Sequence, residues 1–523
     1  MKKIILAFII AFTLNANAQT TPFYKNYDIN TKSDFEETSD IILTLDSCYI
    51  VTCTSYDSTL SSATIELFKI NSLGNVVWRQ TFLCPNSPSY VNIAQAPDSG
   101  FVISSSYDYQ LDTTTKVILI KTDKVGNKQW IKLLGDNTLW QTNYDMQIQG
   151  NSIFLLSCGS IKLGASSYQY AYFVTKTDLL GNVQWYKYYS WTDGGPFYQS
   201  FIVTKKKELY VSAETNTLGN EQFAISKIDS MGNLVWSKTY SPYNDIAPLN
   251  MLVDSMGNLI ITGHMWTSNT NGWDIFLMKT DSLGNFKWGK TYGGWSSDEG
   301  WSVFQSQSGY VICAEPESFL GSSSRASLIK TDSVGNMQWM KIYGDTSGSF
   351  PNGALQLKNG FVIYGINGTY SSNSPIYLLK TDLNGVSSCK WYPVNFPDSS
   401  FTLTSNDTGY SGLVQGIMTY TLTEITRPVN EYNYCDRASI EEYNYLLNNF
   451  RVYPNPNNGS FVIELNSSAK QTMQVYDVNG KMVLSQVING KVIIDASNLN
   501  EGVYNISIIS NEGVVNKRVV IVR

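Results

Sequence analysis

The chain has 523 residues, of which 43% are hydrophobic and 15% are charged. This composition is that of a globular protein and excludes a disordered polymer, and the length exceeds what one compact core usually covers. The formal net charge of −6 lacks the basic face of a general nucleic-acid binder, so no nucleic-acid partner is expected.

Residues 1–18 have the pattern of a secretory signal. Lys2 and Lys3 supply the basic start, residues 4–14 the apolar stretch, and residues 16–18 (Ala-Asn-Ala) a small-residue cleavage site. The apolar stretch is too short for a stable membrane anchor, and no later segment has transmembrane length. The sequence therefore predicts an exported, soluble mature chain without a transmembrane segment.

A repeat of about 50 residues occupies 22–392. Its marker is the glycine of a Gly-Asn pair, which recurs every 50 to 55 residues and is followed four positions later by a tryptophan in the first six copies. The marker glycines are Gly74, Gly126, Gly181, Gly232, Gly284, Gly335 and Gly385, the last without its Asn. A Lys-Thr-Asp triplet or a close variant precedes each turn.

Each unit is interpreted as four strands. The unit around Gly284 has its second strand at 259–263 (LIITG), its third at 274–281 (DIFLMKTD) and its fourth at 286–292 (FKWGKTY). Gly and Asn suit the positive φ of a tight hairpin turn, and the Asp before the turn can accept hydrogen bonds from turn amides. Seven such units predict an all-β chain with a seven-bladed β-propeller over 22–392. A solenoid is the alternative, but its units are usually shorter and it needs capping repeats.

Two further features favour a closed ring. The segment 23–28 (FYKNYD) resembles a fourth strand, whereas the seventh unit's own fourth strand, 390–396, is degenerate. We therefore expect the N-terminal segment to complete the last blade, and the repeat tryptophans to pack between blades. An eighth blade over 393–425 is the alternative, although it lacks the repeat marker.

The fifth residue of every second strand is small, which predicts crowded packing near a common axis. These residues are Cys53, Ser105, Cys158, Ala213, Gly263, Ala314 and Gly365. Cys53 and Cys158 are accordingly interpreted as packing residues rather than reactive thiols.

Residues 393–447 are rich in Thr, Ser, Asn and Tyr and are interpreted as a linker or stalk. Cys389 and Cys435 bracket most of this stretch, and in an oxidising compartment they could form a disulfide. Two unpaired thiols are the alternative.

Residues 448–523 contain about six short strands, which predict a small C-terminal β-sandwich. The phrases YPNPNNG (453–459), VYDVNGKMV (475–483), LNEGVYNI (499–506) and KRVVIVR (517–523) stand in order at the C-terminus. This region resembles the type A C-terminal sorting domain of Bacteroidetes type IX secretion cargo.

The resemblance implies that the type IX secretion machinery is a partner, and that the chain is exported across the outer membrane. Removal of the sorting domain would then leave a secreted or surface-attached protein. The resemblance also carries recognition and folding roles to Pro454, Asn455, Pro456, Gly459, Tyr476, Gly480, Gly502, Tyr504 and Lys517.

Few residue sets could support catalysis. His264 is the only histidine, so His-based metal clusters are excluded and a Ser-His-Asp triad has one candidate; it is interpreted as structural or surface. Asp298 and Glu299 could serve a glycosidase, but neighbours on an extended chain point apart, and the pair is interpreted as an exposed acidic turn. Only Arg79 and Arg325 lie in the propeller, too few for the carboxylate clamp of a sialidase. One carboxylate per turn is too sparse for calcium, so no metal, cofactor or catalytic set is predicted.

The two faces of the predicted propeller differ. The first–second and third–fourth turns are short and uniform, whereas the second–third loops and blade connections on the other face are variable, where function usually resides. Six tryptophans outside the repeat map to the variable face: Trp140, Trp191, Trp266, Trp273, Trp295 and Trp301. Exposed aromatic rings suit stacking on sugars or anchoring a protein, while burial between blades is the alternative.

These features predict a non-enzymatic surface propeller that binds a glycan or a surface protein. A polysaccharide-active hydrolase or lyase, and a structural surface or adhesion component, are the alternatives.

Overall fold

The computed structural model of the chain describes most of residues 22–522. The parts outside the description are 1–21, 29–35, 58–61, 85–88, 110–113, 136–139, 163–167, 191–198, 218–219, 242–244, 268–271, 295, 319–323, 345–347, 369–374, 388–390, 395–397, 402–403, 408–409, 414–416, 419–423, 426–429, 434–449, 466–469, 478–481, 511–512 and 523. The described residues form strands and turns without a helix, in two compact units divided between Asn433 and Tyr434. The predicted signal at 1–18 and the predicted Cys389–Cys435 disulfide lie outside the described residues.

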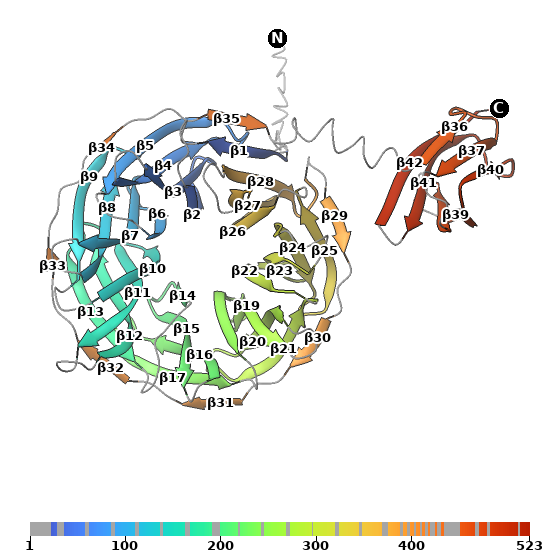
Figure 1. Cartoon of the computed structure of the whole chain (residues 1–523). Helices are drawn as coiled ribbons and strands as arrows, with labels where there is room; N and C mark the ends of the chain where they lie inside the picture. Colours follow the sequence, from blue (N-terminus) through green and yellow to red (C-terminus); the bar gives the residue numbers. More distant parts are fainter. Residues whose placement is uncertain are drawn as a thin grey trace, which may run out of the picture. The chain divides into compact units, whose positions relative to one another are not determined.

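The first unit is a propeller-like ring of seven five-stranded antiparallel sheets (Figure 1), which confirms the predicted all-β class. Strand β1 (Tyr24–Asp28) belongs to sheet 7. The inner four strands of sheets 1 to 6, and the inner three of sheet 7, follow one another along the chain. They are, for sheet 1, β2 (Glu36–Leu43), β3 (Tyr49–Asp57), β4 (Ser62–Ile70) and β5 (Val76–Cys84); sheet 2, β6 (Ser89–Gln95), β7 (Phe101–Tyr109), β8 (Thr114–Thr122) and β9 (Lys128–Leu134); sheet 3, β10 (Trp140–Gln149), β11 (Ser152–Lys162), β12 (Tyr168–Asp178) and β13 (Val183–Ser190); sheet 4, β14 (Gln199–Val203), β15 (Leu209–Thr217), β16 (Asn220–Ile228) and β17 (Leu234–Ser241); sheet 5, β18 (Ile246–Val253), β19 (Leu259–Thr267), β20 (Gly272–Thr280) and β21 (Phe286–Tyr292); sheet 6, β22 (Asp298–Ser306), β23 (Gly309–Pro316), β24 (Ser327–Thr331) and β25 (Met337–Tyr343); and sheet 7, β26 (Ser349–Leu357), β27 (Gly360–Asn367) and β28 (Ile376–Asp382).

The ring closes as the sequence predicted. Strand β1 pairs with β28, with Tyr24 opposite Leu379 and Tyr27 opposite Ile376, and so completes sheet 7. The first and last parts of the ring are therefore hydrogen-bonded to each other within one sheet.

The segment after the repeat departs from the predicted linker or stalk. It supplies one outer strand to each sheet, in reverse order around the ring (Figure 1), and we call these strands the belt. They are β29 (Trp391–Val394) on sheet 6, β30 (Asp398–Phe401) on sheet 5, β31 (Thr404–Asp407) on sheet 4, β32 (Tyr410–Leu413) on sheet 3, β33 (Ile417–Met418) on sheet 2, β34 (Glu424–Ile425) on sheet 1 and β35 (Asn430–Asn433) on sheet 7. Trp391 thus belongs to sheet 6.

The repeated phrase joins each sheet to the next. Gly335 in the β24–β25 turn has φ 83°, and a Cβ built there would lie 2.7 Å from the Trp288 ring of sheet 5. The Tyr292 hydroxyl donates to the Gly335 carbonyl, and Asp332 Oδ1 accepts the backbone N–H of Asn336 at 2.8 Å. Glycine is required at this turn both for its φ and for the approach of the indole. The prediction that the repeat tryptophan packs between neighbouring units is confirmed.

Polar side chains join the innermost strands near the axis. Asp40 on β2 accepts a hydrogen bond from the backbone N–H of Ile93 in sheet 2 at 2.9 Å. Asn250 on β18 accepts one from Val303 in sheet 6 at 3.1 Å. Burial raises the pKa of Asp40 and of Asp145, each to about 7. These groups satisfy backbone donors that the bulged inner strands cannot pair within their own sheet.

The small residues of the second strands are buried in crowded positions, as predicted. A Cβ at Gly263 would lie 2.0 Å from the Ala247 carbonyl oxygen, and one at Gly365 would lie 1.9 Å from that of Phe350. Cys158 is also buried, and burial raises the pKa of its thiol to about 12, which disfavours the reactive thiolate.

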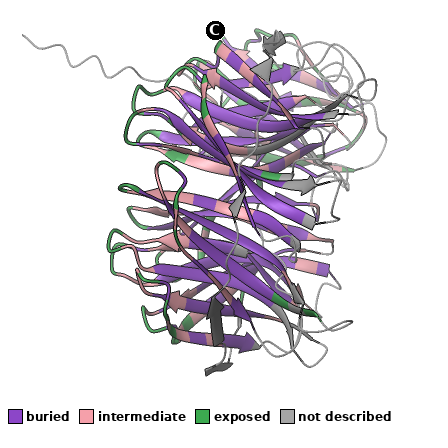
Figure 2. Ribbon diagram, turned by 90° about the vertical axis from the view of Figure 1, so that its left-hand side faces the viewer, coloured by how far each residue is buried: buried purple, intermediate pink, exposed green. Residues whose placement is uncertain are grey.

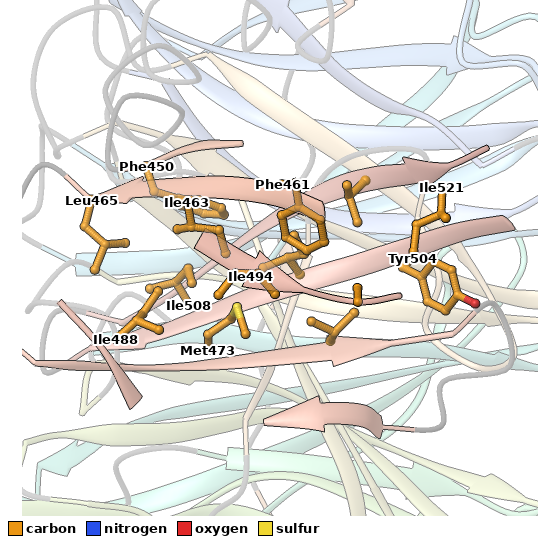
Figure 3. Packing of buried hydrophobic residues seen from close by; sticks show 14 residues of the cluster. Phe450, Phe461, Ile463, Leu465, Met473, Ile488, Ile494, Tyr504, Ile508 and Ile521 are labelled. Atoms are coloured by element: carbon orange, nitrogen blue, oxygen red, sulfur yellow. The ribbon is translucent and has the colours of Figure 1, made fainter. Parts of the chain in front are cut away.

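The second unit is a pair of small sheets, as predicted for the C-terminal region. Its strands are β36 (Phe450–Tyr453), β37 (Ser460–Leu465) and β40 (Lys491–Asp495) in one sheet, and β38 (Gln471–Tyr476), β39 (Met482–Ile488), β41 (Gly502–Ser510) and β42 (Gly513–Ile521) in the other. Figure 3 shows apolar side chains of both sheets meeting in one core, with Phe461 and Ile463 from the first sheet and Met473 and Ile508 from the second.

Candidate functional site

A cluster of aromatic and acidic side chains lies where sheets 5 and 6 adjoin. It is formed by the end of β19, the start of β20, the start of β22 and the end of β23. Short hairpin turns join β18 to β19, β20 to β21 and β22 to β23 at one face of the ring. The ends that form the site are the other ends of these antiparallel strands, so they lie on the opposite face. We call this cluster the sheet 5–6 site, and its residues are His264, Trp266, Trp273, Glu299, Trp301 and Glu315.

Two tryptophans and the histidine form the aromatic part of the site. Trp266 and Trp273 are opposite each other on β19 and β20, with ring centroids 5.6 Å apart at an interplanar angle of 83°. The His264 ring meets Trp273 edge-on at 4.7 Å. Both indoles are only partly buried, so apolar ring surface is available to a ligand.

Two glutamates face each other across β22 and β23. Glu299 is directly opposite Glu315, an arrangement in which like charges repel. Trp301 Nε1 donates a hydrogen bond to Glu315 Oε2 at 3.1 Å, and His264 Nδ1 lies 3.8 Å from Glu299 Oε1. A continuous series of contacts therefore links Trp266 through to Trp301.

The surroundings of Glu299 and Glu315 keep their carboxyl groups partly protonated near neutral pH. Burial, reinforced by the charge of Glu317, raises the pKa of Glu299 to about 7. Burial also raises the pKa of Glu315 to about 7, with Glu299 and Glu317 adding to the effect. The pKa of His264 is lowered to about 4 by burial, so the imidazole is neutral. Carboxyl groups in this state can either donate or accept hydrogen bonds.

Asp298 has a different role from Glu299. It is fully buried and accepts hydrogen bonds from the backbone N–H groups of Gly294 and Ser318, both at 3.0 Å, and from the Ser318 hydroxyl at 2.6 Å. The expectation of an exposed acidic turn is wrong, because both acids belong to β22, whose start packs against sheet 5. The expectation that their side chains point apart is met.

The structure brings together three of the six predicted tryptophans, Trp266, Trp273 and Trp301. Trp140 begins β10, but its side chain lies outside the described residues, as do Trp191 and Trp295 entirely. His264 is buried against the site rather than exposed. Sequence reasoning missed Glu315, whose signal is an acidic residue at the end of an otherwise apolar strand, VICAE (311–315). Among the described residues no cluster of His, Cys, Asp and Glu has the arrangement of a metal site.

In the second unit, the motif around Asn455 ties the start of the domain to its last strand. Asn455 Oδ1 accepts the backbone N–H of Val520 at 2.8 Å, and its Nδ2 donates to the Arg518 carbonyl at 2.9 Å. The bonds preceding Pro454 and Pro456 are cis, and Gly459 has φ 101°. These two hydrogen bonds hold the motif against β42.

Other motif residues also support the domain's packing. The Tyr504 hydroxyl donates to the Asn500 carbonyl at 2.8 Å, and Lys517 Nζ donates to the Phe450 carbonyl at 2.5 Å. The Tyr476 hydroxyl donates to Gln474 Oε1 at 2.6 Å, Gly502 begins β41, and Gly480 lies outside the described residues. The observed contacts are those of folding residues.

Residues 451–522 match the model of the secretion system C-terminal sorting domain. The chain is type IX secretion cargo. It is secreted by that system to the cell surface or the extracellular space, which confirms the predicted route. The described part of the chain contains no helix that is long and apolar enough to cross a membrane.

The solved structures with a similar fold have low sequence identity to this cargo protein. Polysaccharide lyase Uly1 is 11% identical with a TM-score of 0.44, covering 66% of this chain and 90% of its own. An apocarotenoid oxygenase from Synechocystis is 12% identical with a TM-score of 0.31, covering 48% and 58%. A glycosyl hydrolase from Bacteroides ovatus is 10% identical with a TM-score of 0.26, covering 48% and 85%. At these values the likeness says nothing of activity. No curated protein matches the sequence.

Proposed function

We propose that this secreted cargo protein binds carbohydrate at the sheet 5–6 site. The observation that carries the proposal is the series of contacts from Trp266 and Trp273 through Glu299 to Glu315 and Trp301. Partly exposed indoles offer faces on which a sugar ring can stack, and carboxyl groups with pKa values near neutrality can bind hydroxyl groups as donors or acceptors.

The unfavourable free energy of placing two carboxyl groups together also favours a ligand-binding role for the site. Two carboxyl groups placed opposite each other, Glu315 buried and Glu299 partly buried beside a neutral histidine, oppose folding when ionised. Strongly perturbed acids in such a place are more often found at functional sites than elsewhere. A sugar would supply hydroxyl partners to both carboxyl groups.

The test is binding of the full chain to a panel of plant, algal and bacterial polysaccharides, followed by calorimetry with the best oligosaccharide. We expect Trp273→Ala and Trp301→Ala each to weaken binding about 10- to 100-fold, as loss of a stacking ring does at binding hot spots. Trp301→Phe keeps an aromatic face but loses the hydrogen bond to Glu315, so its loss should be smaller.

The matched control is the pair Tyr168→Ser and Tyr170→Ser, two exposed aromatic residues at the start of β12 in sheet 3. It should bind as the unaltered chain does. Binding that survives the Trp273→Ala/Trp301→Ala double variant would refute the proposed location, and binding only to a protein partner would refute the ligand class.

A second candidate function is hydrolysis of the bound glycan, favoured by the pairing of Glu299 with Glu315. Glycosidases use two carboxyl groups as the acid and the base or nucleophile, and one of the pair often has a raised pKa. Release of reducing sugar that Glu299→Gln and Glu315→Gln each abolish, with binding retained, would establish this activity. Tight binding without turnover would leave the site as a binding module.

A further inference from the structure

The hairpin turns on the other face of the ring carry exposed apolar residues, at equivalent positions in six sheets and one residue earlier in sheet 7, where Asn384 takes the equivalent position. In the third–fourth turns these residues are Leu73, Val125, Leu180, Met231, Leu283, Val334 and, in sheet 7, Leu383, with exposed fractions from 44% to 70%. Leu45 and Met256 in two first–second turns are both 83% exposed. Figure 2 shows the exposed turns along the left-hand face of the ring.

This pattern exceeds what turn chemistry requires. The turn needs the Asp that caps it, and the Gly that adopts positive φ, but it does not need an apolar tip. In the β20–β21 turn, for example, Asp281 Oδ1 accepts the N–H groups of Leu283 and Asn285 through the backbone alone. Single exposed apolar residues are ordinary, whereas nine on one face form a surface that calls for a partner.

Lysines surround the same turns. Each unit contributes one turn carboxylate or its Asn equivalent, one lysine two residues before it, and in most units a lysine on the fourth strand that reaches the next turn. The fourth-strand lysines Lys25, Lys132, Lys187 and Lys238 donate to a turn asparagine of the next sheet at 2.6 to 2.9 Å. The β14–β15 turn adds Lys205, Lys206 and Lys207. Of the triplet lysines, Lys121, Lys330 and Lys380 are buried, and Lys69 and Lys279 pair with carboxylates of the first–second turns. Lysines still outnumber the turn carboxylates on this face, although the whole chain has a net charge of −6.

We infer that the turn face docks on an anionic lipid surface. The apolar tips would enter the boundary between headgroups and acyl chains, and the lysines would pair with lipid phosphates, as in other interfacial proteins. A second copy placed face to face would bring lysine against lysine. A soluble acidic polymer would use the lysines but would gain nothing from the apolar tips. Where secretion leaves the chain at the cell surface, such a lipid surface is at hand.

Docking by this face has a consequence for the other one. The sheet 5–6 site is at the opposite ends of the strands, so it would face away from the lipid and toward the medium. The inference does not depend on the proposed carbohydrate binding, since the two faces share no residue.

The experiment is co-sedimentation of the full chain with vesicles of phosphatidylcholine alone and with vesicles of equal parts phosphatidylglycerol and phosphatidylcholine. We expect binding to the anionic vesicles only. Replacing four tips together (Leu180→Ser, Met231→Ser, Leu283→Ser, Val334→Ser) should weaken that binding about 100-fold, because four apolar side chains lose their burial. Lys205→Gln with Lys206→Gln should weaken it about 20-fold at low salt, and less at high salt.

Controls and tests of other occupants make the result decisive. The control Tyr168→Ser/Tyr170→Ser, on the opposite face, should bind vesicles as the unaltered chain does, and unchanged thermal unfolding of each variant excludes misfolding. No binding to anionic vesicles, or binding unaffected by the four-tip variant, overturns the inference. Sedimentation velocity that shows a dimer lost in the four-tip variant would instead assign this face to a second copy. Equal binding to soluble alginate by the four-tip variant would assign it to an acidic polymer.

Discussion

Glu315 is the residue at which burial and like charge act together most directly. It is buried opposite Glu299, and its pKa is raised from an ordinary 4.5 to about 7, first by burial. A carboxyl whose pKa is higher in the folded protein binds protons more tightly there than in the unfolded chain. Its contribution to stability is therefore fully present below pH 4.5, and it is lost as the pH rises through about 7.

Glu315→Gln should remove this pH dependence, because an amide does not ionise. The amide oxygen can still accept the hydrogen bond from Trp301, so the contact is kept. We expect the variant to be more stable than the unaltered chain at pH 8, by about 3 kcal/mol at most, and to show no gain at pH 4. Calorimetric melting temperatures at pH 4, 6 and 8 measure the effect. Glu208→Gln, in the β14–β15 turn, is the control for loss of a glutamate charge. A gain of equal size at all three pH values would show that Glu315 is ionised throughout.

For single residues, the sequence predicted which side chains belong to the site better than it predicted their burial and contacts. Trp266, Trp273 and Trp301 are recognisable because they stand outside the repeat, and the fold brings them together. Glu315 was missed because its importance comes from register, which sets it against a residue 16 positions earlier on the neighbouring strand. Asp298 was misjudged because Ser-Ser-Asp-Glu-Gly has the composition of a turn, whereas burial against sheet 5 makes it a strand.

The belt is the element that the sequence predicts least well. Its strands are two to four residues long and pair only along the outer edge of each sheet. Such strands need backbone donors and acceptors but no apolar periodicity, so their polar composition resembles that of a linker. Side chains add a few contacts, as where Lys341 Nζ lies 4.1 Å from the centre of the Trp391 ring. The four inner strands, by contrast, were readable because apolar alternation and turn residues recur in every unit.

Removing the belt should therefore leave a folded but edge-exposed ring. We expect a chain ending at residue 390 to melt at a lower temperature than one ending at residue 433, and to aggregate through its uncovered strand edges. Differential scanning calorimetry and light scattering of the two truncated chains measure the difference. The chain ending at 433 also lacks the sorting domain, and so it controls for that loss. Equal melting and equal solubility would show that the belt does not stabilise the ring.

The whole first unit is organised as two faces of opposite use. Uniform turns with apolar tips and lysines occupy one face, and the sheet 5–6 site opens on the other. Repetition accounts for this division: a turn that holds the next sheet must be the same in every unit, whereas the opposite ends of the strands are free to vary. The repeat in the sequence was enough to predict that the two faces differ. The residues that meet in the sheet 5–6 site could not be predicted in full, because they come from two sheets that adjoin only in the folded ring.

A short strand at the N-terminal end of the ring, β1, takes part in closing it. Strand β1 lies between β28 and β35, the Tyr27 hydroxyl donates to the Gly74 carbonyl at 2.8 Å, and Lys25 Nζ donates to Asn75 Oδ1 at 2.6 Å. These are the contacts that the fourth strands of other sheets make with the following turn. Sheets 1 and 7 also share a buried apolar cluster that includes Val51 and Val362, so β1 supplies the outer part of their junction.

A chain beginning at residue 29 should melt at a lower temperature, because the junction of sheets 7 and 1 is weakened and the edge of β28 is uncovered. Since β1 is a separate piece of chain, a synthetic peptide of residues 22–28 should restore the melting temperature when added in excess, as binding to the folded state alone does. The same peptide with Lys25→Ala and Tyr27→Phe lacks both polar contacts with the turn of sheet 1, so it should restore less at equal concentration. Calorimetry across a peptide titration measures both. A truncated chain that melts like the full one, or restores equally well with either peptide, would show that the ring does not rely on this closure.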